Sequence, residues 1–163
     1  MQAREIMTSD VATARPDTTL QEAARRLADL NVGALPVCEG RRLVGIVTDR
    51  DITVRATADG MVPGTTLVRA VMSEDVCWCF DDDPVEEIER AMAGSKIRRM
   101  PVVDRAKRLV GMVTLGDLAA RRAPRAQDAL RSISEPSRPR RPGPTTPYED
   151  APWPPYGSGQ LTR

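Results

Sequence analysis

The chain carries one sequence motif twice. Residues 42–51 read Arg-Leu-Val-Gly-Ile-Val-Thr-Asp-Arg-Asp, and residues 108–117 read Arg-Leu-Val-Gly-Met-Val-Thr-Leu-Gly-Asp. A Pro-Val pair precedes each copy, and a Met-Thr or Met-Ser pair lies further upstream, at residues 7–8 and 72–73. Two similar units usually pack together to bury a face that neither can bury alone. The repeat therefore predicts a fold made of two packed halves.

The two halves are expected to contain the same helices. Apolar residues at helical spacing predict one helix over residues 20–28 and its counterpart over residues 85–93. Asp17 and Thr18 are candidate caps of the first of these helices. A second helix is expected after each copy of the motif, from Asp49 to about Ala58 and from Leu115 to about Arg122.

Short apolar runs between these helices predict strands. Two runs in each half are separated by a polar turn and are typical of paired strands, at residues 34–38, 43–47, 100–103 and 109–113. A very short first strand is expected near residues 11–12 and 76–77. Each unit is therefore predicted to have the order β-α-β-β-α, which gives an α/β (α+β) fold class.

These elements and motifs resemble the CBS domain, named after cystathionine β-synthase. The Gly-x-Val-Thr-x-x-Asp ending occurs twice, each time after Leu-Pro-Val or Met-Pro-Val, and the resemblance covers residues 3–128. Two such repeats in tandem resemble a CBS pair, or Bateman module. The resemblance implies two domains, at residues 1–64 and 65–128, packed with pseudo-twofold symmetry. It also implies two clefts between the repeats, an adenosine compound as ligand, and association into a homodimer.

The composition changes after about residue 130. Residues 136–155 contain eight of the fourteen prolines, with arginines between the first of them. Such a composition cannot bury enough apolar surface to fold alone and favours extended polyproline II. We therefore expect residues 129–163 to form a largely disordered Pro/Arg-rich tail, which is a candidate contact with a partner protein.

Bulk composition argues against several classes of function. The net charge is +1, so no electrostatic feature indicates binding to nucleic acid or to an acidic membrane surface. The chain contains no histidine, which is the commonest general base and metal ligand, and no nucleophile–base pair can be assembled. No apolar stretch is long enough for a transmembrane helix or resembles a signal peptide. We therefore expect a cytoplasmic protein that is not an enzyme.

The Thr-x-x-Asp units are the leading candidate site residues. Thr48 with Asp51, and Thr114 with Asp117, stand at strand-to-helix junctions, where a threonine and an aspartate at this spacing form a capping box. The same junction can bind phosphate through free backbone N–H groups, while a nearby carboxylate can accept the ribose hydroxyls. In the CBS family the matching aspartate holds the ribose and the matching threonine lies near the phosphate. From the residues alone, the caps could be the only role.

A phosphate also needs a cation. Arg50 lies within the first Thr-x-x-Asp unit, whereas Gly116 takes its place in the second, so the two clefts are expected to differ. Arg98 and Arg99 precede the Met-Pro-Val of the second repeat, and a guanidinium suits phosphate well. These arginines could equally be solvated surface. We predict that the cleft with Arg50 is the better phosphate site.

An adenine ring requires a slot of small apolar side chains and backbone groups. The resemblance assigns this slot to the first short strand and to the strand around the Pro-Val pair of each repeat, although these positions are also ordinary core. The candidates are Val11, Ala12, Thr13, Ala34, Leu35 and Pro36 in the first repeat, and Val76, Cys77, Met100 and Pro101 in the second.

Two further groups have competing interpretations. Cys77 and Cys79 would point to the same side of a strand and could bind a soft metal or respond to oxidation, but buried small side chains are the favoured interpretation. Trp78, on the opposite face, would plug an interface or the other repeat. The run of aspartates at 81–83 is interpreted as a solvated helix cap rather than a cation site. No metal and no required cofactor are predicted.

The function predicted from these observations is a stand-alone regulatory module. It would bind AMP, ADP, ATP or S-adenosylmethionine between the repeats and signal to an unidentified partner protein. The alternative is a CBS-fold interaction or scaffold protein that binds no ligand and has a stress-related role.

Overall fold

The computed structural model describes residues 1–120 of the 163-residue chain. Both predicted helix–hairpin units are present, and the α+β fold class with two repeats is confirmed. The first repeat contains α2 (Leu20–Asp29), β1 (Ala34–Glu39) and β2 (Arg42–Thr48). The second contains β3 (Cys79–Phe80), α4 (Val85–Ser95), β4 (Arg99–Val103) and β5 (Leu109–Thr114). The predicted tail and the last residues of the final helix lie outside the described residues.

Each repeat is built on an antiparallel hairpin. In the first, β1 pairs with β2 from Ala34 opposite Thr48 to Glu39 opposite Arg42, and Gly40 turns the chain with a φ of +60°. A left-handed backbone of this kind favours glycine because it has no Cβ. In the second, β4 pairs with β5, and Lys107 has the positive φ in a turn that is one residue longer.

The short first strand lies later in each repeat than the sequence analysis predicted. In the second repeat it is β3, which runs parallel to β4 with Cys79 opposite Val102. In the first repeat it is reduced to one parallel bridge between Ala14 and Val37. The predicted positions, 11–12 and 76–77, were therefore wrong by two to three residues. The apolar residues there do not pair in a sheet, and they line cavities between the repeats.

The N-cap prediction for the first helix was wrong, while the helix predicted from Asp49 to about Ala58 is present but is wound differently in its middle. Thr19, rather than Asp17 or Thr18, caps α2, because its hydroxyl accepts the Glu22 N–H at 3.2 Å while the Thr18 hydroxyl already accepts the Arg15 N–H at 3.0 Å. The helix expected from Asp49 starts as the single turn α3 (Asp49–Asp51) and continues as the π-helix η1 (Ile52–Ala56). The wider turn inserts extra backbone, a feature that helical spacing in a sequence does not reveal. Helix α5 begins at Leu115 as predicted and is described to Ala120.

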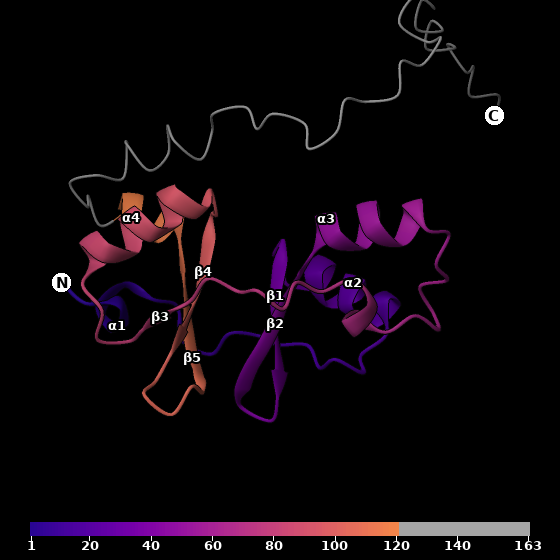
Figure 1. Ribbon diagram of the computed structural model, residues 1–163, viewed down its shortest axis with the longest axis horizontal. Coiled ribbons are helices and arrows are strands. Elements are labelled where there is room, and N and C mark those ends of the chain that lie inside the picture. The colour runs from indigo at the N-terminus through magenta and orange to yellow at the C-terminus, as the bar shows by residue number, and fades with distance from the viewer. Residues whose placement is uncertain (121–163) are drawn as a thin grey trace, which may run out of the picture.

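The repeats exchange their leading segments. The short helix α1 (Ala3–Ile6) precedes the first repeat in sequence but packs into the core of the second, where Ala3 and Ile6 are buried with Ile88 and Met92. Figure 1 shows this indigo segment beside β3 and β5 rather than with the magenta elements of its own repeat. The 3-10 helix η2 (Val68–Ala70) likewise packs into the first core, through Val68. The predicted domain boundary between residues 64 and 65 thus separates the two sequence repeats. It does not separate the two cores, because α1 packs into the second core and η2 into the first.

Backbone contacts join the two halves at three places. Thr8 bridges to Met112, and Ser73 bridges in the same way to Ile46, so each leading segment adds to the hairpin of the other repeat. At the hairpin ends, Arg42 bridges to Arg108. The hairpins therefore lie side by side in the middle of the molecule, with helices on the outer sides (Figure 1). Within residues 1–120, no helix is long and apolar enough to cross a membrane.

Candidate functional site

Both Thr-x-x-Asp units form the predicted capping boxes. The Asp51 N–H donates to Thr48 Oγ1 at 3.0 Å, and Asp51 Oδ2 accepts the backbone N–H of Thr48 at 3.0 Å and its hydroxyl at 2.7 Å. Thr114 and Asp117 repeat the arrangement at 3.2, 2.7 and 2.7 Å. One carboxylate oxygen in each box is therefore committed to the cap, and the second is left for other partners. In Asp51 this second oxygen faces Arg55 Nε at 3.6 Å.

Thr48 lines a cavity of about 260 Å³ between the repeats, which we call the Thr48 cleft. Its other walls come mainly from the second repeat and the segment that leads into it. The predicted site residues found here, besides Thr48, are Ala34, Val76, Cys77, Arg98, Arg99 and Pro101. Its volume is close to the lower end of the range for small-molecule sites, about 300–1,000 Å³.

Thr114 lines a second cavity of about 280 Å³, the Thr114 cleft. Here the arrangement is reversed, because the threonine comes from the second repeat and most apolar walls come from the first. The predicted site residues found here, besides Thr114, are Val11, Ala12, Ala34, Leu35 and Arg99. Each cleft thus combines the helix cap of one repeat with the small apolar side chains of the other.

Arg99 lines both clefts, whereas Arg98 lines only the Thr48 cleft. The Arg99 guanidinium passes close to Gly33, where an added Cβ would lie 3.3 Å from one Arg99 nitrogen and 3.3 Å from Asp49 Oδ2. Because Gly33 has no side chain, it leaves room for the guanidinium of Arg99, the residue that lines both clefts. Arg50 is exposed and lines neither cleft. Of the candidate cations named from the sequence, Arg98 and Arg99 thus line a cleft, whereas Arg50 does not.

Three other predicted slot residues lie elsewhere. Met100 is 0% exposed in the core of the second repeat, between the strand and α4. Pro36 is buried in β1 opposite Ile46 and lines neither cleft. Thr13 lines a separate cavity near the hairpin turn. These segments contain both core and cavity-lining residues, and residue type alone does not show which of the two each one is.

Sequence reasoning missed an acidic residue in each cleft. Asp75 lines the Thr48 cleft beside Ser73, and Asp10 lines the Thr114 cleft beside Thr8. These residues occupy corresponding positions in the repeated segments Met-Ser-Glu-Asp and Met-Thr-Ser-Asp. The repetition of both the hydroxyl and the carboxylate was the signal that could have identified them.

The cysteines have different environments. Cys79 is buried in β3, and burial, followed by the charges of Asp83, Cys77 and Asp81, raises the pKa of its thiol to about 12. Cys77 is half-buried, lies outside the strand, and accepts the Ser95 hydroxyl at 3.8 Å. Cys77 and Cys79 were both expected to be buried small side chains, and only Cys79 is fully buried in the core. Within the described part of the chain, no group of three or more acidic, cysteine or histidine side chains is arranged to hold a metal ion.

Two of the three aspartates at 81–83 bind groups in neighbouring segments of the chain. Asp82 pairs with Arg105 at 2.7 Å, and Asp83 Oδ2 accepts the Phe80 N–H at 2.8 Å. The residue at the N-cap position of α4 is Pro84, so none of the three aspartates is the cap itself. Trp78 is 37% exposed and packs edge-on against Phe80, so it is not buried in the other repeat, and its predicted role in an interface stays a prediction.

The geometry described above has counterparts in known proteins. A family model of the CBS domain matches residues 3–56 and 68–123. The chain belongs to the CBS-domain family. The two matched segments begin and end close to the sequence repeats, and the second extends beyond the described residues.

Relatives support this assignment along most of the chain. The CBS domain-containing protein YhcV of Bacillus subtilis (strain 168) is 44% identical over 133 residues, which cover 80% of this chain and 94% of YhcV. The crystal structure of Hypoxic Response Protein I with two coordinated zinc ions is similar at 33% identity and a TM-score of 0.68, covering 74% of this chain and 98% of that one. The CBS domain pair of protein MJ0100, in complex with 5′-methylthioadenosine and S-adenosyl-L-methionine, is similar at 30% identity and a TM-score of 0.65, covering 74% and 94%.

Proposed function

We propose that this CBS pair is a regulatory module that binds adenosine compounds in the Thr48 and Thr114 clefts and transmits their binding to a partner protein. The observation that carries the proposal is the construction of each cleft from a threonine-capped helix start, a wall of small apolar side chains and a shared arginine. A helix start and an arginine suit a phosphate or carboxylate, and the apolar wall suits an adenine ring. The adenosine ligands of the MJ0100 pair support this assignment.

The charges lining the two clefts favour different ligands. The Thr48 cleft has two arginines, Arg98 and Arg99, and one carboxylate, Asp75. The Thr114 cleft has only Arg99, balanced by Asp10, and its walls are more apolar. We therefore assign phosphate-bearing ligands (AMP, ADP or ATP) to the Thr48 cleft. S-adenosylmethionine, which carries an ammonium as well as a carboxylate, suits the Thr114 cleft because Asp10 can accept the cationic group.

Signalling requires that the ligand bind two conformations with different affinity. The clefts lie between the repeats, so a ligand that fills one contacts both halves and can change their packing. We expect the same chain to form a homodimer in the cytoplasm, through which such a change would reach its partner. Light scattering with and without ligand tests the dimer.

The experiment that tests the ligand is a thermal-shift and calorimetric panel on the full chain with AMP, ADP, ATP, S-adenosylmethionine and GMP. A ligand specific for the native state stabilises it by about 2.7 kcal/mol at a hundredfold excess over its Kd. We expect Val76→Phe to block the Thr48 cleft and Ala12→Phe to block the Thr114 cleft, since neither residue takes part in a helix cap. Val62→Phe, at a position that is 62% exposed, is the control for the added ring.

Loss of nucleotide binding in Val76→Phe alone, with binding intact in Val62→Phe, would support the assignment. If no adenosine compound shifts the melting temperature of the parent chain, the ligand-free scaffold becomes the better explanation. In that case the Thr-x-x-Asp units serve only as helix caps.

A further inference from the structure

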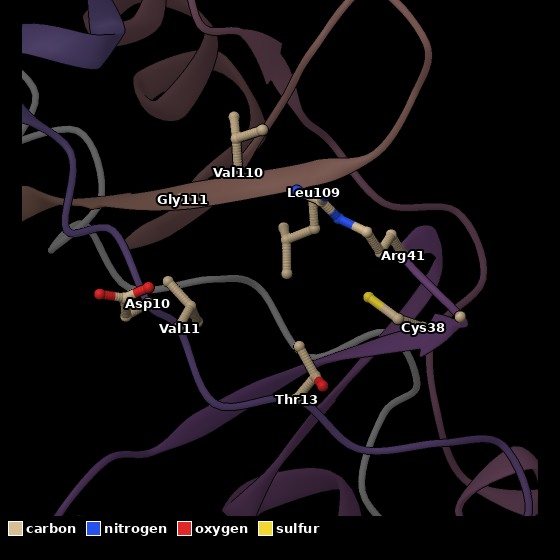
Figure 2. Close-up of a pocket in the computed structure, with 9 residues that line it drawn as sticks. Asp10, Val11, Thr13, Cys38, Arg41, Leu109, Val110 and Gly111 are labelled. Atoms are coloured by element: carbon tan, nitrogen blue, oxygen red, sulfur yellow. The ribbon is translucent and has the colours of Figure 1, made fainter.

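A third cavity lies between the repeats, at the hairpin ends and away from both helix caps. It has a volume of about 360 Å³, and we call it the hairpin cavity. Figure 2 shows Asp10 and Val11 at one end and Arg41 at the other, with Thr13 and Leu109 pointing into the space between them. The cavity shares Asp10 and Val11 with the Thr114 cleft, but neither Arg99 nor a capping threonine lines it.

The second repeat shows what occupies the corresponding place there. Thr13 precedes the bridge residue Ala14 as Trp78 precedes Cys79 of β3, and the two stand at the same position of the repeat. Arg41 and Lys107 correspond likewise, because each directly precedes one of the bridged residues Arg42 and Arg108.

In the second repeat this pair is a stacked cation and aromatic ring. Lys107 Nζ lies 3.4 Å from the centroid of the Trp78 indole, and 4.8 Å from that of Phe80. In the first repeat the cation remains, as Arg41, but a threonine replaces the tryptophan, and both residues line the hairpin cavity. The first repeat therefore has the cation of the pair and an open space where the second repeat has a ring.

We propose that the hairpin cavity binds a planar aromatic group of about the size of an indole, stacked against the Arg41 guanidinium. A guanidinium is the side chain best suited to such stacking, because it is planar and weakly hydrated. Leu109 and Val11 supply apolar contacts to the ring, whereas the Val110 side chain points the other way, against the core of the second repeat (Figure 2). Asp10, at the other end, provides a carboxylate that can accept a ring N–H.

The aromatic group could belong to a free molecule or to this chain, whose only aromatic residues beyond position 120 are Tyr148, Trp153 and Tyr156. The chemistry recognised is the same in both cases. Such a site would let the first repeat bind an aromatic group away from both helix caps, in a cavity that shares Asp10 and Val11 with the Thr114 cleft.

The test is a titration of the full chain with indole, followed by saturation-transfer NMR on the indole ring protons, with cyclohexylmethanol as the non-aromatic control. We expect indole to bind and the control not to bind. Thr13→Trp should place a ring in the cavity and remove indole binding, while Arg41→Leu should weaken it about two- to fivefold, as expected for loss of an exposed cation–π contact. Trp78→Thr, the matched change in the second repeat, should retain indole binding.

A parallel titration of Trp153→Ala distinguishes the two sources of the ring. Indole binding to the parent chain supports a free ligand, whereas indole binding that appears only in Trp153→Ala supports occupation by the chain's own tryptophan. Absence of indole binding in both proteins would overturn the proposal. So would undiminished binding in both Thr13→Trp and Arg41→Leu, the second of which adds no bulk that could disturb folding.

Discussion

Gly111 lies directly against Met7, a residue more than one hundred positions earlier in the chain. A Cβ added at Gly111 would lie 2.5 Å from Met7 Sδ and 2.9 Å from the Thr8 carbonyl oxygen. Gly45 stands in the same relation to Met72, with Sδ at 2.9 Å and the Ser73 oxygen at 3.1 Å. The repeated glycine and the repeated Met-Thr or Met-Ser pair are thus two sides of one contact, which each repeat makes with the leading segment of the other.

We expect Gly111→Ala to destabilise the protein by about 1–3 kcal/mol, the usual cost of overpacking a buried contact. A flexible methionine could move aside, but the Thr8 carbonyl is part of the backbone and is held by its bridge to Met112. Urea unfolding of the parent chain and of Gly111→Ala measures the difference in unfolding free energy. Gly94→Ala is the matched control, because Gly94 lies in α4 with nothing within 4 Å of an added Cβ.

The control should be neutral or stabilising, since alanine is the better helix former by up to about 1 kcal/mol. Equal effects of the two substitutions would show that the contact between Gly111 and the leading segment does not restrict the fold.

The elements of each repeat could be predicted because their signals are local. The hairpins β1–β2 and β4–β5 follow from apolar runs joined by a polar turn, and the capping boxes follow from Thr-x-x-Asp spacing. The exchange of α1 and η2 between the repeats was not predicted. This exchange depends on contacts between residues that are distant in sequence. Gly45 and Gly111 leave room for these contacts, but the sequence does not distinguish them from other strand glycines because it does not show which residue packs against them.

The second prediction concerns Arg99, which lines both adenosine clefts, while its neighbour Arg98 lines one. If the clefts bind anionic ligands, Arg99→Met should weaken binding in both and Arg98→Met only in the Thr48 cleft. A charge-assisted hydrogen bond contributes about 1.5–3 kcal/mol, which corresponds to a loss of roughly ten- to a hundredfold in affinity. Calorimetry with AMP and with S-adenosylmethionine on each variant measures the two effects.

Arg50→Met is the control for removal of a neighbouring exposed arginine, because Arg50 lines neither cleft. A loss of affinity in this variant as large as in Arg99→Met would show that the first Thr-x-x-Asp unit supplies the cation after all.

The site was less predictable than the fold for a physical reason. Val11, Val76 and Met100 are all apolar residues in short extended segments, yet two line clefts and the third is buried in the core. Which side of a segment faces a cavity depends on how the repeats pack, and that packing is set by residues elsewhere in the chain. Arg99 was among the candidate cations, but the sequence could not show that it lines both clefts, because it reaches them across the boundary between the repeats.

Thiol reactivity gives a third prediction. Burial raises the pKa of Cys38 and raises that of Cys79 to about 12, so both remain protonated thiols at neutral pH, and they are only 3% and 5% exposed. Cys77 is the one cysteine that is half-exposed. Ellman's reagent should therefore modify one thiol rapidly in the native protein and all three after denaturation. Cys77→Ser should remove the rapid phase, and a rapid phase that persists in this variant would contradict the buried placement of the other two.

The last prediction is a pH dependence at Asp104. Its carboxylate accepts the N–H groups of Arg108 at 3.0 Å and Ala106 at 2.9 Å, and it also accepts Arg108 Nε at 2.7 Å. These hydrogen bonds, that of the Arg108 backbone first, hold the pKa of Asp104 below its ordinary value. Because the folded-state pKa lies below the unfolded-state value of about 3.9, the ionised carboxylate contributes stability above that value. This contribution is lost as the pH falls through the lowered pKa.

Asp104→Asn should therefore reduce the unfolding free energy at pH 7 and lose its effect as the pH falls below about 4. Urea unfolding at pH 7, 5 and 3 measures the difference between the parent and the variant. Glu39, the corresponding residue of the first repeat, has an exposed side chain, and Glu39→Gln is expected to change stability by no more than about 0.5 kcal/mol at pH 7. A difference between parent and Asp104→Asn that stays constant from pH 7 to pH 3 would mean that the charge of Asp104 does not stabilise the turn.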